Sequence, residues 1–228
     1  MDWTQRTRML IGDAALQNLQ QKKVIVFGTG GVGGSLAEAL VRTGIGRIDI
    51  VDFAAVDVTN LNRQVIATTE SVGRIKVEVF RERALSIRPD LEMETFPIRL
   101  NAENIGDFDF SAYDYVADAT DDVSAKLLLA EAVQKAKVPF IASMGAGNKL
   151  RPECFEIAKL SETSVCPLAR VMRREARKRG IDDYTVVYSK EPPREIPKEQ
   201  RTPASIAFVP PAAGLIMASK IVRDLIEK

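Results

Sequence analysis

The glycine-rich segment at residues 28–33 constrains the fold more than any other part of the sequence. Its residues, GTGGVG, fit the pattern GxGxxG and directly follow the apolar run at 24–27. An apolar run without alternation is typical of a strand buried on both faces of a parallel sheet. Residues 32–43 then place apolar side chains at helical spacing. A strand, a tight glycine turn and a helix in this order predict a phosphate-binding βαβ unit.

The rest of the chain repeats this alternation of strand and helix. Alternation of this kind favours an α/β fold with a doubly wound, Rossmann-like, mostly parallel sheet. We expect one domain over residues 1–228, with a nucleotide-binding core at about 22–145 and an elaborated C-terminal third, about 146–228, for substrate binding and dimer formation. Residues 191–203 contain four prolines and are expected to form an exposed loop. Strands are predicted at 48–51, 92–98, 113–118, 139–143 and 184–188, and helices at 73–87, 124–135, 167–178 and 211–226.

Composition excludes several classes of protein. The 228 residues are 46% hydrophobic and 28% charged, with a formal net charge of +1, which is typical of a globular protein and does not by itself indicate a nucleic-acid binder. The chain has no histidine, so histidine-based catalysis and histidine-ligated zinc are excluded. The apolar stretch at 206–219 is interrupted by two prolines and is too short for a bilayer span, so no membrane association is expected.

The two cysteines, Cys154 and Cys166, are too few for a four-thiolate zinc site or a disulfide scaffold. We therefore expect no structural zinc, and a reducing cytoplasm is the location that fits. Cys166 precedes Pro167 at a predicted helix start, where the pKa of a thiol tends to fall. A catalytic or sulfur-relay role for Cys166 stays open, although adenylation and cyclisation do not require a thiol. Cys154 is expected in a strand and buried.

Charged side chains that a dinucleotide site does not need follow the second predicted strand. Asp52, at the end of that strand, is placed to accept hydrogen bonds from a ribose. Arg63 and Lys76 come next, and Asp121 follows a later strand. The carboxyl ends of strands meet at one crevice in such a sheet, so these groups are expected beside the glycine loop. Two cations, a carboxylate for a divalent metal and a phosphate loop suit a triphosphate and phosphoryl or nucleotidyl transfer.

The order of these motifs resembles the ThiF/MoeB superfamily, which is related to the ubiquitin-activating enzymes. The resemblance runs from about Arg6 to the C-terminus, and it implies adenylation of a carboxylate with ATP and Mg²⁺. The arginine matched by Arg6 reaches the ATP of the partner subunit in this family, which implies a homodimer. The resemblance assigns ATP binding to Gly28, Gly30, Gly31, Gly33, Asp52, Asn60 and Gln64, catalysis to Arg63, Lys76, Asp121 and Arg6, and magnesium binding to Asp121.

Three later stretches are similar to one branch of this superfamily, the tRNA threonylcarbamoyladenosine dehydratases. They are SMGAGNKL at 143–150, TSVCPLAR at 163–170 and TPASIAFVP at 202–210. Members of the branch use ATP to activate the threonyl carboxylate of a modified adenosine in tRNA, and the carbamoyl group then closes onto the activated carbonyl. The resemblance therefore implies an ATP-dependent dehydratase whose substrate is tRNA carrying threonylcarbamoyladenosine.

A basic segment agrees with a nucleic-acid substrate. Between residues 165 and 180 there are six cations and one acid, Glu175. Phosphate backbones attract such a segment. On a helix, Arg173 and Arg177 share one side, with Arg170 one turn earlier. The predicted nucleic-acid contacts are Arg170, Arg173, Arg174, Arg177, Lys178 and Arg179.

Three other functions fit parts of the sequence. An adenylating activator of a ubiquitin-like sulfur carrier fits the superfamily, and a sulfur-transfer protein stays open as a partner, but the paired zinc cysteines usual in such activators are absent. An NAD-dependent oxidoreductase fits the glycine loop but leaves Arg63 and Lys76 unexplained. A nucleotide-binding protein without catalysis is disfavoured because the chain keeps Asp52, Arg63, Lys76 and Asp121 together.

Overall fold

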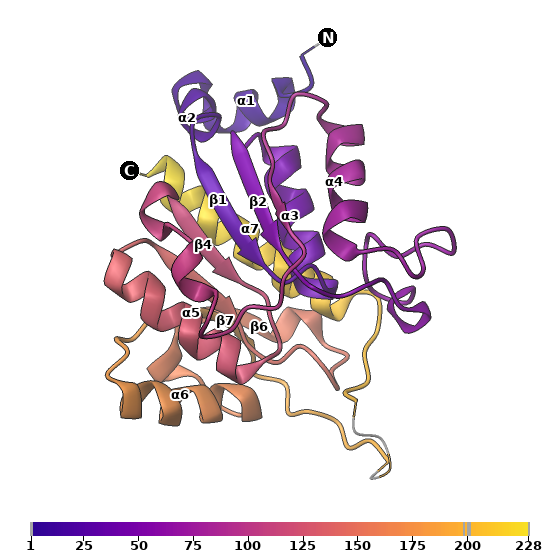
Figure 1. The fold of residues 1–228 in the computed structure, drawn as a ribbon, viewed down its shortest axis with the longest axis vertical. Helices are drawn as coiled ribbons and strands as arrows, with labels where there is room; N and C mark the ends of the chain where they lie inside the picture. Colours follow the sequence, from indigo (N-terminus) through magenta and orange to yellow (C-terminus); the bar gives the residue numbers. More distant parts are fainter. Residues whose placement is uncertain (1, 198, 200–201, 228) are drawn as a thin grey trace.

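The computed structural model describes residues 2–197, 199 and 202–227, so residues 198, 200 and 201 of the expected 191–203 loop lie outside the described residues. Within the described part, seven strands form one sheet in the order β3-β2-β1-β4-β5-β7-β6 (Figure 1). All neighbouring strands are parallel except β6, which pairs antiparallel with β7. The predicted doubly wound, mostly parallel α/β sheet is confirmed. The strands are β1 (Lys23–Phe27), β2 (Arg47–Val51), β3 (Thr95–Phe96), β4 (Tyr115–Asp118), β5 (Phe140–Ser143), β6 (Phe155–Lys159) and β7 (Thr185–Ser189).

Helices cover both faces of this sheet, and β1 shows why. Val24 and Val26 pack into one apolar cluster while Ile25 and Phe27 pack into another, because successive side chains of a strand point to opposite faces. The first cluster includes residues of α3 (Gly31–Thr43), α4 (Lys76–Ile87) and α7 (Val209–Ile226). The second includes residues of α5 (Val123–Ala136), and a third cluster joins α5 to α6 (Pro167–Arg179) and β7.

Five helices begin at the edge of the sheet where the parallel strands end. α3 and α5 directly follow β1 and β4. α4 begins at Lys76, whose N–H donates to the carbonyl of Ala54 just beyond β2. Cys166, immediately before α6, lies against Gly145 after β5, and Pro210 in the first turn of α7 lies against Gly31. The strand order reverses beside β1, so the crevice for a ligand is expected at this same edge.

Two short helices, α1 (Gln5–Ile11) and α2 (Asp13–Leu19), have no counterpart in the sequence prediction. They lie at the opposite end of the sheet from the glycine loop, near the N label in Figure 1. Leu16 and Leu19 of α2 are buried, whereas α1 buries none of its residues. Met9 and Leu10 of α1 leave 79% and 85% of their surface exposed. In the described part of the chain, no helix is both long enough and apolar enough to cross a bilayer.

Some predicted boundaries were wrong. The helix expected from residue 73 begins at Lys76, because Gly73 has a φ of +86° and its N–H donates to the carbonyl of Val56 in a turn. The strand expected at 92–98 is reduced to Thr95–Phe96, at the edge of the sheet. Cys154 is half-buried and ends a short 3₁₀ turn rather than lying in a strand. The strand in which Cys154 was expected is β6, which begins at the next residue.

Candidate active site

The glycine loop brings the N-terminus of α3 against the ends of β1 and β4. Gly28 has a φ of +90°, and a Cβ there would lie 2.8 Å from the carbonyl oxygen of Ala119. A Cβ on Gly33 would lie 1.7 Å from the carbonyl oxygen of Gly28, so no other residue fits. Gly30 is the N-cap residue of α3 and has open space around it. The first N–H groups of α3 therefore face the crevice without a capping side chain, which is the usual arrangement for binding a phosphate.

Asp52 is held in a fixed orientation beside this loop. Its Oδ2 accepts hydrogen bonds from the backbone N–H of Thr29 at 2.7 Å and from the Thr29 hydroxyl at 2.8 Å. Its Oδ1 accepts from the N–H of Ala54 at 2.9 Å. Thr29 is fully buried and Asp52 is half-buried. The carboxylate thus stands at the rim of the crevice with lone pairs still available for a sugar hydroxyl.

The segment after β2 places an amide and a guanidinium next to the glycines. Gln64 is 7% exposed, and its Nε2 is the nearest atom, at 3.9 Å, to the Cβ position of Gly30. Its Oε1 is buried and has no hydrogen-bond partner among the described residues. The side chain of Arg63 lies against Gly31, with its Cγ 3.5 Å from the Cβ position of that glycine. Polar ligand atoms in the crevice would satisfy this amide, which fits a nucleotide site.

Asn60 has a structural role in addition to the one predicted for it. It is buried, and its Oδ1 accepts a hydrogen bond from the N–H of Asp57 at 3.1 Å. The Asp57 carboxylate in turn accepts from the N–H of Thr59, so the two side chains close a short 3₁₀ turn at Val58–Asn60. Direct contact of Asn60 with ATP stays a prediction, but its contacts in the structure shape the turn that carries Arg63.

Lys76 supplies a second cation at the same edge. It is the first residue of α4, it is 9% exposed, and within the described part of the chain its ammonium makes no hydrogen bond or ion pair. Its charge reaches Asp57, whose pKa is lowered chiefly by the hydroxyl and N–H of Thr59 and further by Lys76. An ammonium without a partner among the described residues, on a side chain that is otherwise largely buried, favours an anionic ligand at this edge.

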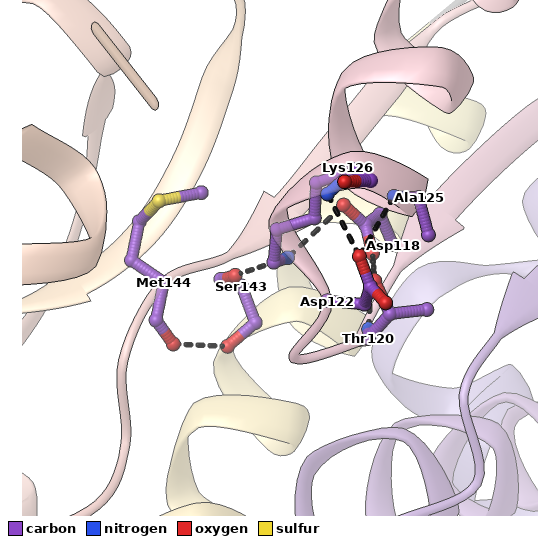
Figure 2. A network of polar contacts seen from close by, with 8 residues as sticks. Asp118, Thr120, Asp122, Ala125, Lys126, Ser143 and Met144 are labelled. Carbon is purple, nitrogen blue, oxygen red and sulfur yellow. Dashed lines mark hydrogen bonds and ion pairs between the residues drawn. The ribbon is translucent and has the colours of Figure 1, made fainter. Parts of the chain in front are cut away.

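A buried ion pair supports the loop that carries Asp121. Asp118 and Lys126 are both fully buried, and the Lys126 ammonium lies 3.0 Å from Asp118 Oδ2. Figure 2 shows this pair and its neighbours. The same ammonium donates to the carbonyl of Ser143 at 2.7 Å. Asp118 Oδ1 accepts from the N–H and hydroxyl of Thr120, which turns the chain after β4. The ends of β4 and β5 are therefore joined by one lysine, a contact that the sequence analysis missed.

Asp121 itself projects from this loop. It is exposed, and its neighbour Asp122 caps α5 by accepting from the N–H groups of Ser124 and Ala125. In the described ranges, no group of three or more acidic, cysteine or histidine side chains is arranged to hold a metal ion. Magnesium commonly binds through one or two carboxylates together with substrate phosphates and water. A single exposed carboxylate beside a phosphate loop fits that mode.

Comparisons with known proteins identify the family. The model of the ThiF family matches residues 4–228. The tRNA threonylcarbamoyladenosine dehydratase of Bacillus subtilis is 39% identical over 97% of this chain and 94% of its own length. Two crystal structures of Escherichia coli tRNA N6-threonylcarbamoyladenosine dehydratase, one with AMP and one with ATP, superpose with TM-scores of 0.92 and 0.91 at 31% and 30% identity, and each alignment covers 99% of this chain and 95% of theirs.

The chain belongs to the ThiF family. The relatives with the same fold over their whole length are dehydratases, which favours this branch over the sulfur-carrier activators. At one end of the sheet, the structure of this ThiF-family chain brings the loop Gly28–Gly33 together with Asp52, Arg63 and Gln64. Lys76 and the loop that carries Asp121 lie at the same edge. The roles predicted for these residues remain predictions.

Arg6 is the one predicted catalytic residue that the fold of this ThiF-family chain does not bring to the crevice. It is exposed on α1, which lies at the other end of the sheet (Figure 1). Nearby, the guanidinium of Arg88 lies over the ring of Trp3, 5.9 Å from the ring centroid. The Trp3 ring also lies against Gly44 at the C-terminal end of α3. Arg6 therefore has no route to the nucleotide site of its own chain.

The basic residues of α6 are not equivalent. Arg173 donates to the carbonyl of Thr163 at 2.8 Å and also bonds the hydroxyl of Thr163, so it holds the segment before α6. Arg174 and Lys178 both pair with Glu175. Arg179 pairs with Glu131. Arg170 and Arg177 are exposed and form no ion pair within the described residues, so their charges are the most available for phosphates.

Proposed function

We propose that this member of the ThiF family is an ATP-dependent tRNA threonylcarbamoyladenosine dehydratase. The observation that carries the proposal is the uncapped N-terminus of α3 with Gln64, Arg63 and Lys76 around it, in a chain whose full length matches dehydratases. A nicotinamide dinucleotide carries only a pyrophosphate, and it leaves the unpaired ammonium of Lys76 without an anion.

The reaction begins when the ionised threonyl carboxylate of the modified adenosine attacks the α-phosphorus of ATP. An acyl–phosphate bond forms, the bond to the β-phosphate oxygen breaks, and pyrophosphate leaves. The carbamoyl group then attacks the activated carbonyl through its nitrogen or oxygen and releases one N–H proton to solvent, AMP departs with one carboxylate oxygen, and the ring closes. The carboxylate is already ionised at neutral pH, so the first step needs no general base.

The residues of the crevice act chiefly by binding and by stabilising charge. The N–H groups at the start of α3 hold phosphate oxygens, and Asp52 accepts from ribose hydroxyls. Arg63 and Lys76 stabilise the negative charge that grows on the α-phosphate and on the departing pyrophosphate. Asp121 holds Mg²⁺, which neutralises phosphate charge when it is bound.

The tRNA lies, in this proposal, across α6 and the 191–203 loop. Arg170 and Arg177 contact phosphates most directly, Arg174, Lys178 and Arg179 do so after exchanging their acidic partners, and Arg173 keeps the adjoining segment in place. This divides the work of the chain: residues 22–145 bind ATP, and residues 146–228 bind the substrate and a second subunit. The location in the cell is then the cytoplasm, where tRNA is modified.

A homodimer explains Arg6. On a helix that buries none of its own residues and exposes Met9 and Leu10, Arg6 reaches the ATP of the partner subunit rather than its own. A sulfur-transfer protein remains a second kind of partner, but no contact in the structure specifies one, and activation of a ubiquitin-like sulfur carrier is the weaker alternative because the chain has only two cysteines.

The test is pyrophosphate release from ATP and Mg²⁺ with tRNA that carries threonylcarbamoyladenosine and with an unmodified transcript. We expect release only with the modified tRNA, and a loss of about 100-fold or more in Asp121→Ala. Asp182→Ala is the matched control, because Asp182 is an exposed acid at the other end of the sheet. ATP binding without release on either tRNA would reject the dehydratase, and release with a carrier protein ending in glycine would establish the alternative.

A further inference from the structure

Asn62 lies between the arginine of the nucleotide site and a segment far away in sequence. The Arg63 guanidinium donates from Nη1 to Asn62 Oδ1 at 2.9 Å and to the carbonyl of Thr59 at 2.9 Å. The Asn62 amide donates from Nδ2 to the carbonyl of Ser205 at 3.0 Å. Because one nitrogen of the Arg63 guanidinium donates to two acceptors, the orientation of the guanidinium is fixed. One of these acceptors, the Asn62 amide, is in turn held by the carbonyl of Ser205.

The segment that contains Ser205 is firmly placed on its other side. Ala204 exchanges two hydrogen bonds with Asn148 after β5: its N–H donates to Asn148 Oδ1 at 2.7 Å, and its carbonyl accepts from the Asn148 N–H at 2.8 Å. Pro203 lies against Gly147, where a Cβ would be 2.7 Å from the proline Cβ. Contacts therefore run without a break from the end of β5 through Ser205 to Arg63.

The side chain of Ser205 adds a second observation. Its hydroxyl oxygen is buried and has no hydrogen-bond partner among the described residues, as is also true of the amide oxygen of Gln64. Buried polar atoms without partners are rare, and each calls for an explanation, of which a ligand is one. The segment thus lies beside Asn62 with the Ser205 carbonyl bonded to the Asn62 amide. The Ser205 hydroxyl has no partner among the described residues.

We infer that Asn62 is a positioning residue, which holds the Arg63 guanidinium in the direction that the reacting phosphate requires. The same side chain holds residues 203–205 next to that guanidinium. This rests on the proposed function, which places ATP next to Arg63. Asn62 is exposed, so it contributes little to the core, and its loss leaves the charge of Arg63 in the crevice. The effect therefore falls on alignment in the transition state more than on ATP binding.

A double-mutant cycle tests the inference. Asn62→Ala should lower kcat for pyrophosphate release by about tenfold while ATP affinity changes by less than about threefold, since the interaction that is lost matters most in the transition state. In an Arg63→Ala background the same substitution should have no further effect, because Asn62 acts only through the arginine. Asn62→Gln, which keeps both an acceptor and a donor, should recover part of kcat.

Asn18→Ala is the matched control, because its amide also donates to a distant carbonyl, that of Leu225 at 2.8 Å, but at the opposite end of the sheet. It should leave kcat unchanged. Equal and additive losses for Asn62→Ala with and without Arg63 would overturn the inference. The same cycle is measured on ATP binding without tRNA. Release by the wild type tests the proposed function, and the coupling in kcat tests the positioning role. No release by the wild type rejects both, whereas release with additive losses rejects the positioning role alone.

Discussion

The two halves of the carboxyl edge differ in the closest contacts that hold them. On the β1–β4 side, glycines allow backbone to meet backbone, as at Gly33 and the carbonyl of Gly28. On the β5–β7 side, side chains hold the backbone: the Glu191 carboxylate accepts from the N–H of Leu150 at 3.0 Å and of Arg151 at 2.8 Å, and the Lys149 ammonium donates to the carbonyl of Glu191. A backbone contact of the first kind has a single arrangement, whereas side-chain bonds can be exchanged. The nucleotide side is therefore preformed, and the substrate side is the adjustable one.

The largest effect should come from Gly33→Ala. The new methyl carbon would lie 1.7 Å from the Gly28 carbonyl oxygen, so α3 would have to move away from β1. We expect a loss of about 4 kcal/mol or more in the free energy of unfolding and no measurable ATP binding. Gly106→Ala is the control, because nothing lies within 4 Å of its Cβ position. Thermal unfolding of both variants measures the loss of stability. A Gly33→Ala variant as stable as the wild type would show that the backbone on the nucleotide side can rearrange.

Breaking the buried pair should come next. Lys126→Met leaves the Asp118 carboxylate buried without its cation, which typically costs about 3 kcal/mol or more. We expect denaturant unfolding to show this loss, with the Asp118→Asn/Lys126→Met double variant recovering a part of it. Glu153→Gln is the control, because it breaks an ion pair with Arg151 in which both side chains are more than half exposed. A loss under about 1 kcal/mol in Lys126→Met would mean that Thr120 alone secures Asp118.

The smallest effect, and the one that depends on pH, should come from Glu191→Gln. Burial raises the pKa of the Glu191 carboxyl, but the N–H groups of Leu150 and Arg151 and the Lys149 ammonium outweigh burial and hold it below its usual value. A lowered folded-state pKa gives stability that is present above the unfolded pKa and is lost as the pH falls through the folded one. We therefore expect a loss of about 1 kcal/mol at pH 7 that shrinks below about pH 4.

Urea titrations of wild type and Glu191→Gln between pH 3 and pH 7 measure this difference. A difference that stayed constant over the range would mean that the carboxylate charge contributes nothing. Steady-state kinetics with modified tRNA separate the two sides as well. If the substrate side is adjustable, Glu191→Gln should raise the KM for tRNA more than the KM for ATP.

Patterns of short range predicted the nucleotide side well. The apolar run before Gly28 and the glycine spacing predicted the loop, and the meeting of parallel strand ends predicted Asp52 and Arg63 beside it. Gln64 was assigned only through the family resemblance. The residues that act through tertiary contact were missed. Lys126 looks like an ordinary surface residue in a helical pattern, and only the folded chain shows it between Asp118 and Ser143.

The C-terminal third was harder for the same reason. The alternation of Phe155, Ile157 and their polar neighbours signals a half-buried strand, but its antiparallel pairing with β7 depends on contacts thirty residues apart. Arg173 belongs to the predicted basic helix, but its hydrogen bond to the Thr163 carbonyl, which holds the segment before α6, could not be predicted from the sequence. Asn60 was predicted to contact ATP, and the structure shows in addition that its side chain closes the turn in which it lies.

Five helices begin at the same edge of the sheet, and their aligned dipoles make this end of the molecule more positive, which the formal net charge of +1 does not show. Each helix contributes partial positive charge at its N-terminus, so an approaching polyanion is drawn toward one end of the protein and turned before contact. The consequence is kinetic. Added salt should slow the encounter with an anionic substrate while leaving turnover at saturation nearly constant.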